Sequence, residues 1–131
     1  SHCFGTIQKC FASLDTEIRH LSNPCSVDYL SLSGSIEDHA NNTPLVVQHL
    51  RQIVKNLQYI YGMELIHACQ AIELRKRQGK FNLGKGTAAA YEAFRKELPL
   101  YTNDRPLAPD VKKAYEFVKS AALLRSVGEA R

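Results

Sequence analysis

Apolar residues recur along this chain at intervals of three and four, which is the spacing that places side chains on one face of an α-helix. The pattern predicts helices over residues 2–22, 44–78, 87–98 and 109–126. The apolar stripe of the first helix consists of Phe4, Ile7, Phe11, Leu14, Ile18 and Leu21. No segment has the alternating pattern of a strand pair, so we expect residues 1–131 to form a single all-α region.

Residues that favour helix ends lie near the boundaries of these patterns. Thr43 is a candidate N-cap of the long helix, and Pro44 suits its first turn. Gly79 follows the last turn of the same helix and predicts its end. Thr87 and Pro109 suit the starts of the two later helices. These signals predict that each helix is a distinct element with its own connection to the next.

The predicted helix over 44–78 is longer than the domain that would contain it. At 1.5 Å per residue it spans about 52 Å, whereas a compact chain of 131 residues has a diameter of about 36 Å. From Gly62 onward the helix is apolar on almost every side, which is typical of a helix buried on every side. We therefore expect its surroundings to come from other subunits or from further chain, and we expect self-association.

Charge and hydropathy exclude two classes of partner. The chain carries 17 Lys and Arg against 13 Asp and Glu, a formal charge of +4. Its basic run, Arg75–Arg77, falls at the predicted end of the long helix, where cations complement the helix dipole, so we expect no nucleic-acid partner. No apolar run approaches the roughly 18 residues of a membrane helix, so we expect no membrane partner.

The cysteines indicate a reducing compartment. Cys3, Cys10, Cys25 and Cys69 lie far apart and form no C-x-x-C pair, which is the spacing that a zinc site favours. A small secreted scaffold would hold more cysteines for its length. We therefore expect free thiols in a cytoplasmic protein and no metal site. The chain does not begin with Met, so we expect it to be processed or cut from something larger.

Two patterns imitate ligand sites. Residues 79–86 have the spacing G-x-x-x-x-G-K of a phosphate loop, but a helix precedes them and Thr87 is displaced by one position. Pairs of the form Glu-x-x-His, which di-iron bundles use, begin at Glu17 and Glu64. The first pair points away from the apolar stripe of its own helix, and we interpret His67 as a hydrogen-bonded interior or interface histidine. Neither pattern predicts a site.

Residues 23–43 interrupt the helical pattern for about 20 residues. Loops of this length are uncommon in compact domains and are usually functional or disordered, and the apolar residues in this one favour an ordered, functional loop. Its densest titratable cluster is Glu37, Asp38 and His39. Two interpretations stay open: a carboxyl group with a raised pKa that does acid/base work, or a carboxylate that caps a helix start.

The motifs of the loop and of the later helices, taken in order, resemble the aromatic amino-acid ammonia-lyase family, and its histidine ammonia-lyases in particular. Residues 23–28 read Asn-Pro-Cys-Ser-Val-Asp, and residues 33–39 read Ser-Gly-Ser-Ile-Glu-Asp-His. Residues 64–75, 86–92 and 107–110 resemble later segments of the same family. The resemblance covers most of residues 12–120.

The resemblance implies a homotetramer in which long antiparallel helices form part of an oligomeric helical bundle, with active sites built from more than one subunit. It implies elimination of ammonia from histidine or a related aromatic amino acid. The family's electrophilic methylidene-imidazolone group forms from an Ala-Ser-Gly tripeptide, which this sequence does not contain. The chain therefore resembles the C-terminal piece of a lyase, with no cofactor-binding residue of its own and no activity alone.

The resemblance also assigns three residues of the loop. Glu37 matches the glutamate that faces the substrate in histidine ammonia-lyases, where it binds the amino group or does acid/base work, and it is our candidate catalytic residue. Phenylalanine and tyrosine lyases have Gln there. Ser35 and Ile36 replace an Asn-Gln pair and are candidate substrate-binding residues. Ile36 lacks the hydrogen bonds of Gln, which leaves the substrate open.

Two other functions stay open at this point. One is a non-enzymatic oligomerisation module, in which the long helix only associates with other helices. The other is a lyase or aminomutase of the same family with a different aromatic substrate. An Ala-Ser-Gly tripeptide encoded upstream of this chain would favour an enzyme over the oligomerisation module.

Overall fold

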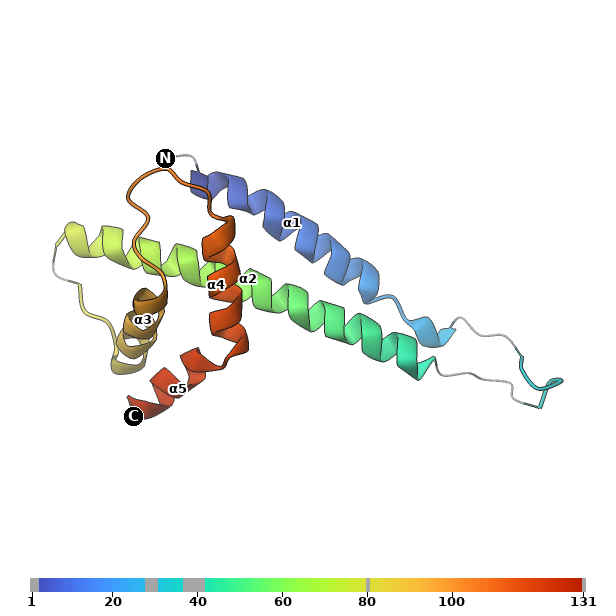
Figure 1. The fold of residues 1–131 in the computed structure, drawn as a ribbon. Coiled ribbons are helices and arrows are strands. Elements are labelled where there is room, and N and C mark those ends of the chain that lie inside the picture. The colour runs from blue at the N-terminus through green and yellow to red at the C-terminus, as the bar shows by residue number, and fades with distance from the viewer. Residues whose placement is uncertain (1–2, 28–30, 37–41, 80, 131) are drawn as a thin grey trace. The chain divides into compact units, whose positions relative to one another are not determined.

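The computed structural model describes residues 3–27, 31–36, 42–79 and 81–130. Within these ranges the chain forms five α-helices, one short 3-10 helix and no extended strand, so the prediction of an all-α fold is confirmed (Figure 1). The elements are α1 (Cys3–Leu21), η1 (Cys25–Val27), α2 (Thr43–Arg77), α3 (Lys85–Glu97), α4 (Ala108–Lys119) and α5 (Ala122–Glu129). No helix of the described ranges is both long enough and apolar enough to cross a membrane.

The chain divides into two compact units. The larger unit contains the residues up to Lys9 and those from Gln58 onward. The smaller unit contains Cys10–Leu57. Both α1 and α2 contribute residues to each unit, and α3, α4 and α5 belong to the larger unit alone.

The long helix α2 begins and ends close to its predicted boundaries. Asn42 occupies the N-cap position, because its carbonyl accepts the first helical hydrogen bond from the Val46 backbone N–H at 3.0 Å. Thr43, our candidate cap, is therefore the first residue inside the helix. At the other end, Gly79 adopts a φ of 151°, a left-handed value that favours glycine. The sequence signals located this helix to within one residue at each end.

The helix α3 begins two residues earlier than predicted. Gly84 is its N-cap, and the Gly84 carbonyl accepts a hydrogen bond from the Ala88 backbone N–H at 2.8 Å. Thr87, the predicted cap, lies in the first turn of the helix instead. No side chain caps this end, so the backbone alone determines where α3 begins.

The helix predicted over 109–126 is two helices in the structure. Ala121 adopts the left-handed conformation, with φ 57° and ψ 18°, and separates α4 from α5. Ser120 stabilises the break, since its Oγ donates to the Phe117 carbonyl at 2.9 Å and accepts from the Ala122 backbone N–H at 3.3 Å. The change of direction brings α5 against α3 (Figure 1), a tertiary contact that periodicity cannot show.

Aromatic side chains form the core of the larger unit. Phe94 of α3 is fully buried and meets Phe117 of α4 edge to face, with ring centroids 5.3 Å apart. Ile66 and Cys69 of α2 pack into the same cluster, so three helices share one core. Each such side chain contributes about 1.5–3 kcal/mol when buried. At the end of α2, the Lys76 ammonium lies 4.1 Å from the centre of the Tyr91 ring, a cation–π contact.

A buried amide joins the helices of the smaller unit. Asn56 of α2 is only 2% exposed. Its Nδ2 donates to Glu17 Oε2 of α1 at 2.9 Å, and its Oδ1 accepts from Gln52 Nε2 at 3.0 Å. Both ends of the amide are therefore satisfied, which a buried polar group requires. Glu17, which the apolar pattern turned away from the core, is thus a partner of α2.

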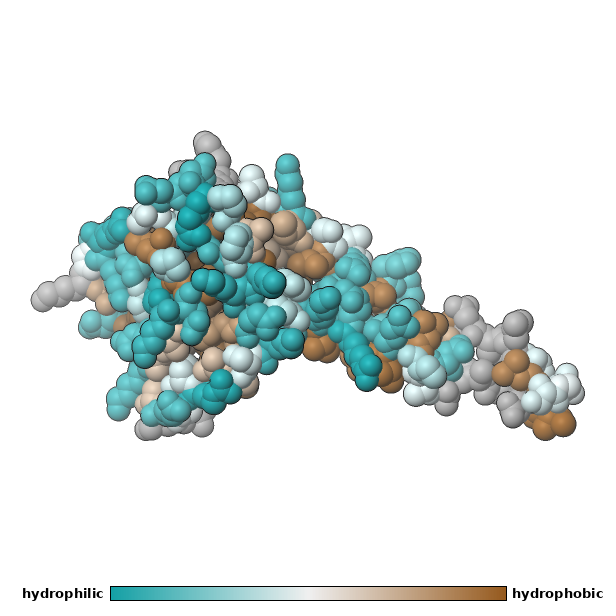
Figure 2. Space-filling model, in the orientation of Figure 1, coloured by the Kyte–Doolittle hydropathy of each residue, from teal (hydrophilic) through white to brown (hydrophobic). Residues whose placement is uncertain are grey.

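The first part of α2 carries large apolar side chains at its surface. Leu50 is 56% exposed and Val54 is 45% exposed, and both lie in the smaller unit. Figure 2 shows apolar residues at the surface over this part of the helix. In the larger unit, Tyr61 and Leu74 of the same helix are each about half exposed. The described residues therefore leave an apolar face of α2, which holds Leu50, Val54 and Tyr61, uncovered.

Candidate functional site

The predicted site lies in the loop between α1 and α2, which belongs to the smaller unit. Glu37, the candidate catalytic residue, lies outside the described residues, as do Asp38 and His39. The structure describes both ends of the loop and the turn that directly precedes Glu37. The geometry that can be described is therefore that of the turn before Glu37 and of the two ends of the loop.

The turn that precedes Glu37 has a constrained backbone. Ser33, Gly34 and Ser35 adopt positive φ values of 52°, 66° and 70°. The Ser35 backbone N–H donates to the Leu32 carbonyl at 3.1 Å and closes the turn. Left-handed conformations at two serines cost about 1–2 kcal/mol each, and such strain gathers at functional sites.

The two candidate substrate-binding residues sit on this turn, at its surface. Ser35 is exposed, and the Ile36 side chain is 84% exposed, which is unusual for so large an apolar group. An isoleucine in this position is available to contact a ligand or a neighbouring chain. The described residues bring no second functional group against Ser35 or Ile36.

A set of three side chains closes the base of the loop. Asn42 Nδ2 donates to the Cys25 carbonyl at 2.9 Å, which joins the residue before α2 to η1. Cys25 Sγ lies 3.3 Å from Nδ1 of His49, one turn and a half into α2. Cys25 and His49 are half-buried. The contacts hold together the two ends of the segment that carries Glu37.

Sequence reasoning missed this closure. Asn42 and His49 follow Cys25 by 17 and 24 residues, so no local spacing relates either residue to Cys25. Asn42 adopts a φ of 49°, which Asn tolerates better than most residues, but this tendency does not identify its contact with Cys25.

The histidine of the second Glu-x-x-His pair has a structural role. His67 Nδ1 donates to the Met63 carbonyl at 2.8 Å, in the tautomer that this contact requires. The Phe4 ring meets His67 edge to face at 5.0 Å. The prediction that His67 is hydrogen-bonded is confirmed, and its side chain is half-buried. Glu17 of the first pair bonds to Asn56 within the smaller unit, so the two pairs serve different contacts.

Cys69 is the buried thiol of the larger unit. It is 3% exposed, and burial raises the pKa of the Cys69 thiol above its ordinary value of 9.0. The nearby Arg95 guanidinium lowers this pKa, and Glu73 raises it, but both effects are smaller than that of burial. Cys69 therefore stays protonated at neutral pH and behaves as a core side chain.

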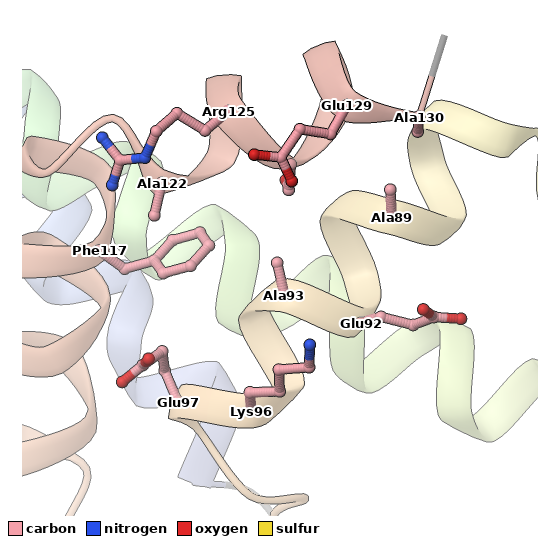
Figure 3. Close-up of a pocket in the computed structure, with 11 residues that line it drawn as sticks. Ala89, Glu92, Ala93, Lys96, Glu97, Phe117, Ala122, Arg125, Glu129 and Ala130 are labelled. Carbon is pink, nitrogen blue, oxygen red and sulfur yellow. The ribbon is translucent and has the colours of Figure 1, made fainter.

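An open cleft of about 480 Å³ lies between α3 and α5 in the larger unit. Figure 3 shows the small side chains of Ala89 and Ala93 on its α3 side, with Lys96 nearby, and Arg125 and Glu129 on its α5 side. Both cationic and anionic side chains line the cleft, and no cysteine or histidine does. None of the predicted site residues lines it, and we interpret it as a gap in the packing of the two helices.

A comparison with protein-family models identifies the family of the chain. The model described as "Aromatic amino acid lyase" matches residues 1–96. The chain belongs to the aromatic amino acid lyase family. The match includes α1, the loop and the whole of α2, so the candidate site falls inside it.

Comparison with individual curated proteins gives the same family. The chain is 34% identical over 127 residues to histidine ammonia-lyase 1 of Fusobacterium nucleatum and 35% identical over 127 residues to histidine ammonia-lyase of Sorangium cellulosum. Each match covers 97% of this chain and 24% of the relative. The chain therefore spans about a quarter of the length of the curated relatives that it matches.

Two solved structures share the fold. Ergothionase of Treponema denticola, an ergothioneine-degrading enzyme solved with desmethyl-ergothioneine sulfonic acid, is 50% identical with a TM-score of 0.85 over 92% of this chain and 24% of its own. Histidine ammonia-lyase of Trypanosoma cruzi is 25% identical with a TM-score of 0.86 over 95% of this chain and 24% of its own. The second shows that the fold persists at half the identity of the first.

Proposed function

We propose that this chain is the C-terminal region of a lyase that eliminates an amine from a histidine-type substrate. Family membership supports the class of reaction. The observation that carries the choice of substrate is the 50% identity to an ergothioneine-degrading enzyme, against 34% and 35% for the two curated histidine ammonia-lyases. We therefore favour ergothioneine, the trimethylated betaine of 2-thiohistidine, over histidine itself.

The proposed reaction is a β-elimination. A base of the parent enzyme takes a proton from the β-carbon, the bond between the α-carbon and nitrogen breaks, and the nitrogen keeps the electron pair. A double bond then joins the α- and β-carbons. With histidine the departing group is ammonia, and with a betaine it is trimethylamine, which leaves as a neutral molecule without taking up a proton.

The residues of this chain do not supply the electrophilic group that the family resemblance implies. That group forms from Ala-Ser-Gly, whereas Leu14 follows Ala12-Ser13 here and Leu32 precedes Ser33-Gly34. The group would have to come from another part of the parent protein. We therefore expect the purified 131-residue chain to lack turnover with histidine and with ergothioneine.

The loop is suited to a quaternary ammonium group. In our proposal the Glu37 carboxylate attracts the positive charge on the substrate nitrogen. A trimethylammonium group has no N–H to donate, so a neighbour without polar atoms, such as Ile36, costs it no hydrogen bond. The methyl groups instead favour contact with an apolar side chain. Ser35 and the strained turn would position this pair of residues.

Substrate comparison in a full-length lyase that contains this chain tests the choice of substrate. The unsaturated imidazole product absorbs in the near ultraviolet, so both reactions can be followed directly. We expect kcat/KM for ergothioneine to exceed that for histidine by about 100-fold, which corresponds to two steps of about 1.4 kcal/mol. A preference for histidine would overturn the ergothioneine assignment and leave the lyase assignment standing.

Substitution of Glu37 in the same full-length enzyme tests its role. Glu37→Gln keeps the size and removes the charge, and we expect kcat/KM for ergothioneine to fall at least roughly 100-fold. The matched control is Glu116→Gln, which neutralises an exposed carboxylate on α4 and should leave the rate unchanged. Equal rates for Glu37→Gln and the unchanged enzyme would show that the Glu37 charge has no role in turnover.

The uncovered face of α2 supports an oligomer. Leu50 and Val54 in the smaller unit, and Tyr61 in the larger, expose apolar area that costs free energy in water. We propose that other subunits cover this face in the parent enzyme, and that the isolated chain self-associates through it. Sedimentation of the chain at micromolar concentration tests this, because a monomeric mass would contradict it.

The described cysteines support the proposed cytoplasmic location. Cys10, Cys25 and Cys69 are free thiols in the structure. Unpaired thiols are typical of proteins in a reducing compartment. Fractionation of the source cells with an antibody against the chain tests this proposal, and recovery from the cell envelope would overturn it.

A further inference from the structure

The contact between a thiol and an imidazole at the base of the loop is not explained by the proposed reaction. Cys25 Sγ and His49 Nδ1 are 3.3 Å apart, although 24 residues separate them along the chain. The Cys25 thiol has a second acceptor, the Asn23 carbonyl, at 3.8 Å. Nδ1 is closer, and in the tautomer that carries its proton on Nε2 it accepts the thiol proton.

We propose that Cys25 and His49 form a thiol modification site for small soft electrophiles, in which His49 acts as the base. An imidazole within hydrogen-bond reach of a thiol is the arrangement that activates nucleophilic cysteines. Asn42 supports it, since its amide holds the Cys25 carbonyl at 2.9 Å and so fixes the backbone from which the thiol projects. Both reacting side chains are half-buried, so each keeps part of its surface exposed to solvent.

The reaction with a small disulfide is balanced without any further reactant. His49 Nδ1 takes the thiol proton, and Cys25 Sγ attacks one sulfur of the reagent. A new S–S bond forms and the original one breaks, with its electron pair on the departing sulfur. The departing thiolate then takes the proton from His49. With iodoacetamide, an S–C bond forms, the C–I bond breaks and iodide leaves with the electron pair.

The other described cysteines provide an internal comparison. Cys10 is exposed on α1, and Cys69 is buried in the core of the larger unit. If access alone controlled the reaction, Cys10 would react first and half-buried Cys25 later. If the neighbouring imidazole controls it, Cys25 reacts first. The order of reaction therefore distinguishes the proposed site from an ordinary surface thiol.

The test uses the folded 131-residue chain and a limiting amount of iodoacetamide at neutral pH, with each cysteine-containing peptide quantified by mass spectrometry. We expect Cys25 to be alkylated roughly tenfold faster than Cys10. The variant His49→Gln keeps a polar side chain but provides no base, and it should abolish this preference. The matched control, His20→Gln, removes an exposed histidine of α1 and should leave the preference intact.

Two results would overturn the proposal: Cys25 reacting no faster than Cys10, or His49→Gln keeping the full Cys25 rate. Cys69 reports on folding in the same experiment, because its alkylation stays slow only while the core is intact. If His49→Gln exposes Cys69, the ratio of Cys25 to Cys10 in the unchanged chain decides the question. The measurement does not depend on turnover, so a failure of the proposed enzymatic function would not affect it.

Discussion

A Cβ atom added to Gly62 would lie 2.9 Å from the backbone nitrogen of Tyr115, so α2 and α4 meet at a point with no room for a side chain. One turn earlier on α2, the ring of Tyr59 stacks on the ring of Tyr115, with centroids 4.1 Å apart and planes 10° from parallel. Both contacts involve Tyr115, so the close approach at Gly62 and the stacked rings lie side by side. A side chain at position 62 would therefore disturb the packing of α4 on α2.

Gly62→Ala should destabilise the chain by about 1–3 kcal/mol, because the new methyl group meets the backbone of Tyr115 and Ala114 rather than a movable side chain. Urea unfolding followed by circular dichroism measures the change. Gly5→Ala is the control: nothing lies within 4 Å of its Cβ, so helix propensity should stabilise α1 by about 0.5–1 kcal/mol. A neutral Gly62→Ala would show that the two helices separate at no cost.

Ala121→Gly should stabilise the chain, which is the reverse of the usual effect of glycine. Ala121 has a φ of 57°, where the alanine Cβ is strained and glycine is not, so the gain is about 1 kcal/mol. Ala93→Gly in the interior of α3 should instead destabilise by about 1 kcal/mol. Thermal unfolding of both variants tests the pair. Equal losses of stability would show that α4 and α5 form one continuous helix in solution.

Asn56→Ala should destabilise the smaller unit by about 1–3 kcal/mol, since Gln52 Nε2 and Glu17 Oε2 lose their buried partner. Glu17→Gln keeps an acceptor for the Asn56 amide and should change stability by less than about 1 kcal/mol. Urea midpoints of the two variants provide the comparison. Similar losses in both variants would mean that the Asn56 amide stabilises this unit chiefly through its hydrogen bond to the charged Glu17 carboxylate.

The Cys69 thiol should make stability fall in alkaline solution. Burial raises the pKa of this thiol above 9.0 in the folded chain, so the unfolded chain loses the proton first as the pH rises. The free energy of unfolding should therefore decrease above about pH 9, because the folded state binds more protons than the unfolded state. Urea unfolding at pH 7, 9 and 10 measures the effect.

Cys69→Ala separates this effect from the titration of other groups. The variant should be less stable than the unchanged chain at pH 7, because it leaves a cavity in a tightly packed core. The difference in free energy of unfolding between the two proteins should narrow above about pH 9. Only the unchanged chain has the Cys69 thiol, whose deprotonation favours the unfolded state. A constant difference across this pH range would contradict the raised pKa.

Local patterns in the sequence predicted most of the helices and most of their ends. The boundaries of α1 and α2 lie within one residue of their predicted positions, because apolar spacing and end signals act over a few residues. The break at Ala121 was not predictable, because alanine carries no signal for a left-handed conformation. Contact of α5 with α3 stabilises that conformation, and such a contact has no local signature.

The candidate site was predictable only in part. The motifs around Glu37 indicate the family, and the family model covers them. The assignments of Glu37, Ser35 and Ile36 stay predictions. The closure of the loop by Cys25 and His49 could not be foreseen, since a contact across 24 residues depends on how α1, η1 and α2 pack.

The amino-acid order of this chain was sufficient for its all-α class, its long helix and its family, because periodicity, end signals and short motifs are properties of neighbouring residues. Folding in three dimensions was needed to bring Gly62 against Tyr115, Asn56 against Glu17, and Cys25 against His49. Those contacts join residues far apart in the chain, and their energies come from exact distances and burial. The spacing of residues along the sequence does not contain these distances or this burial.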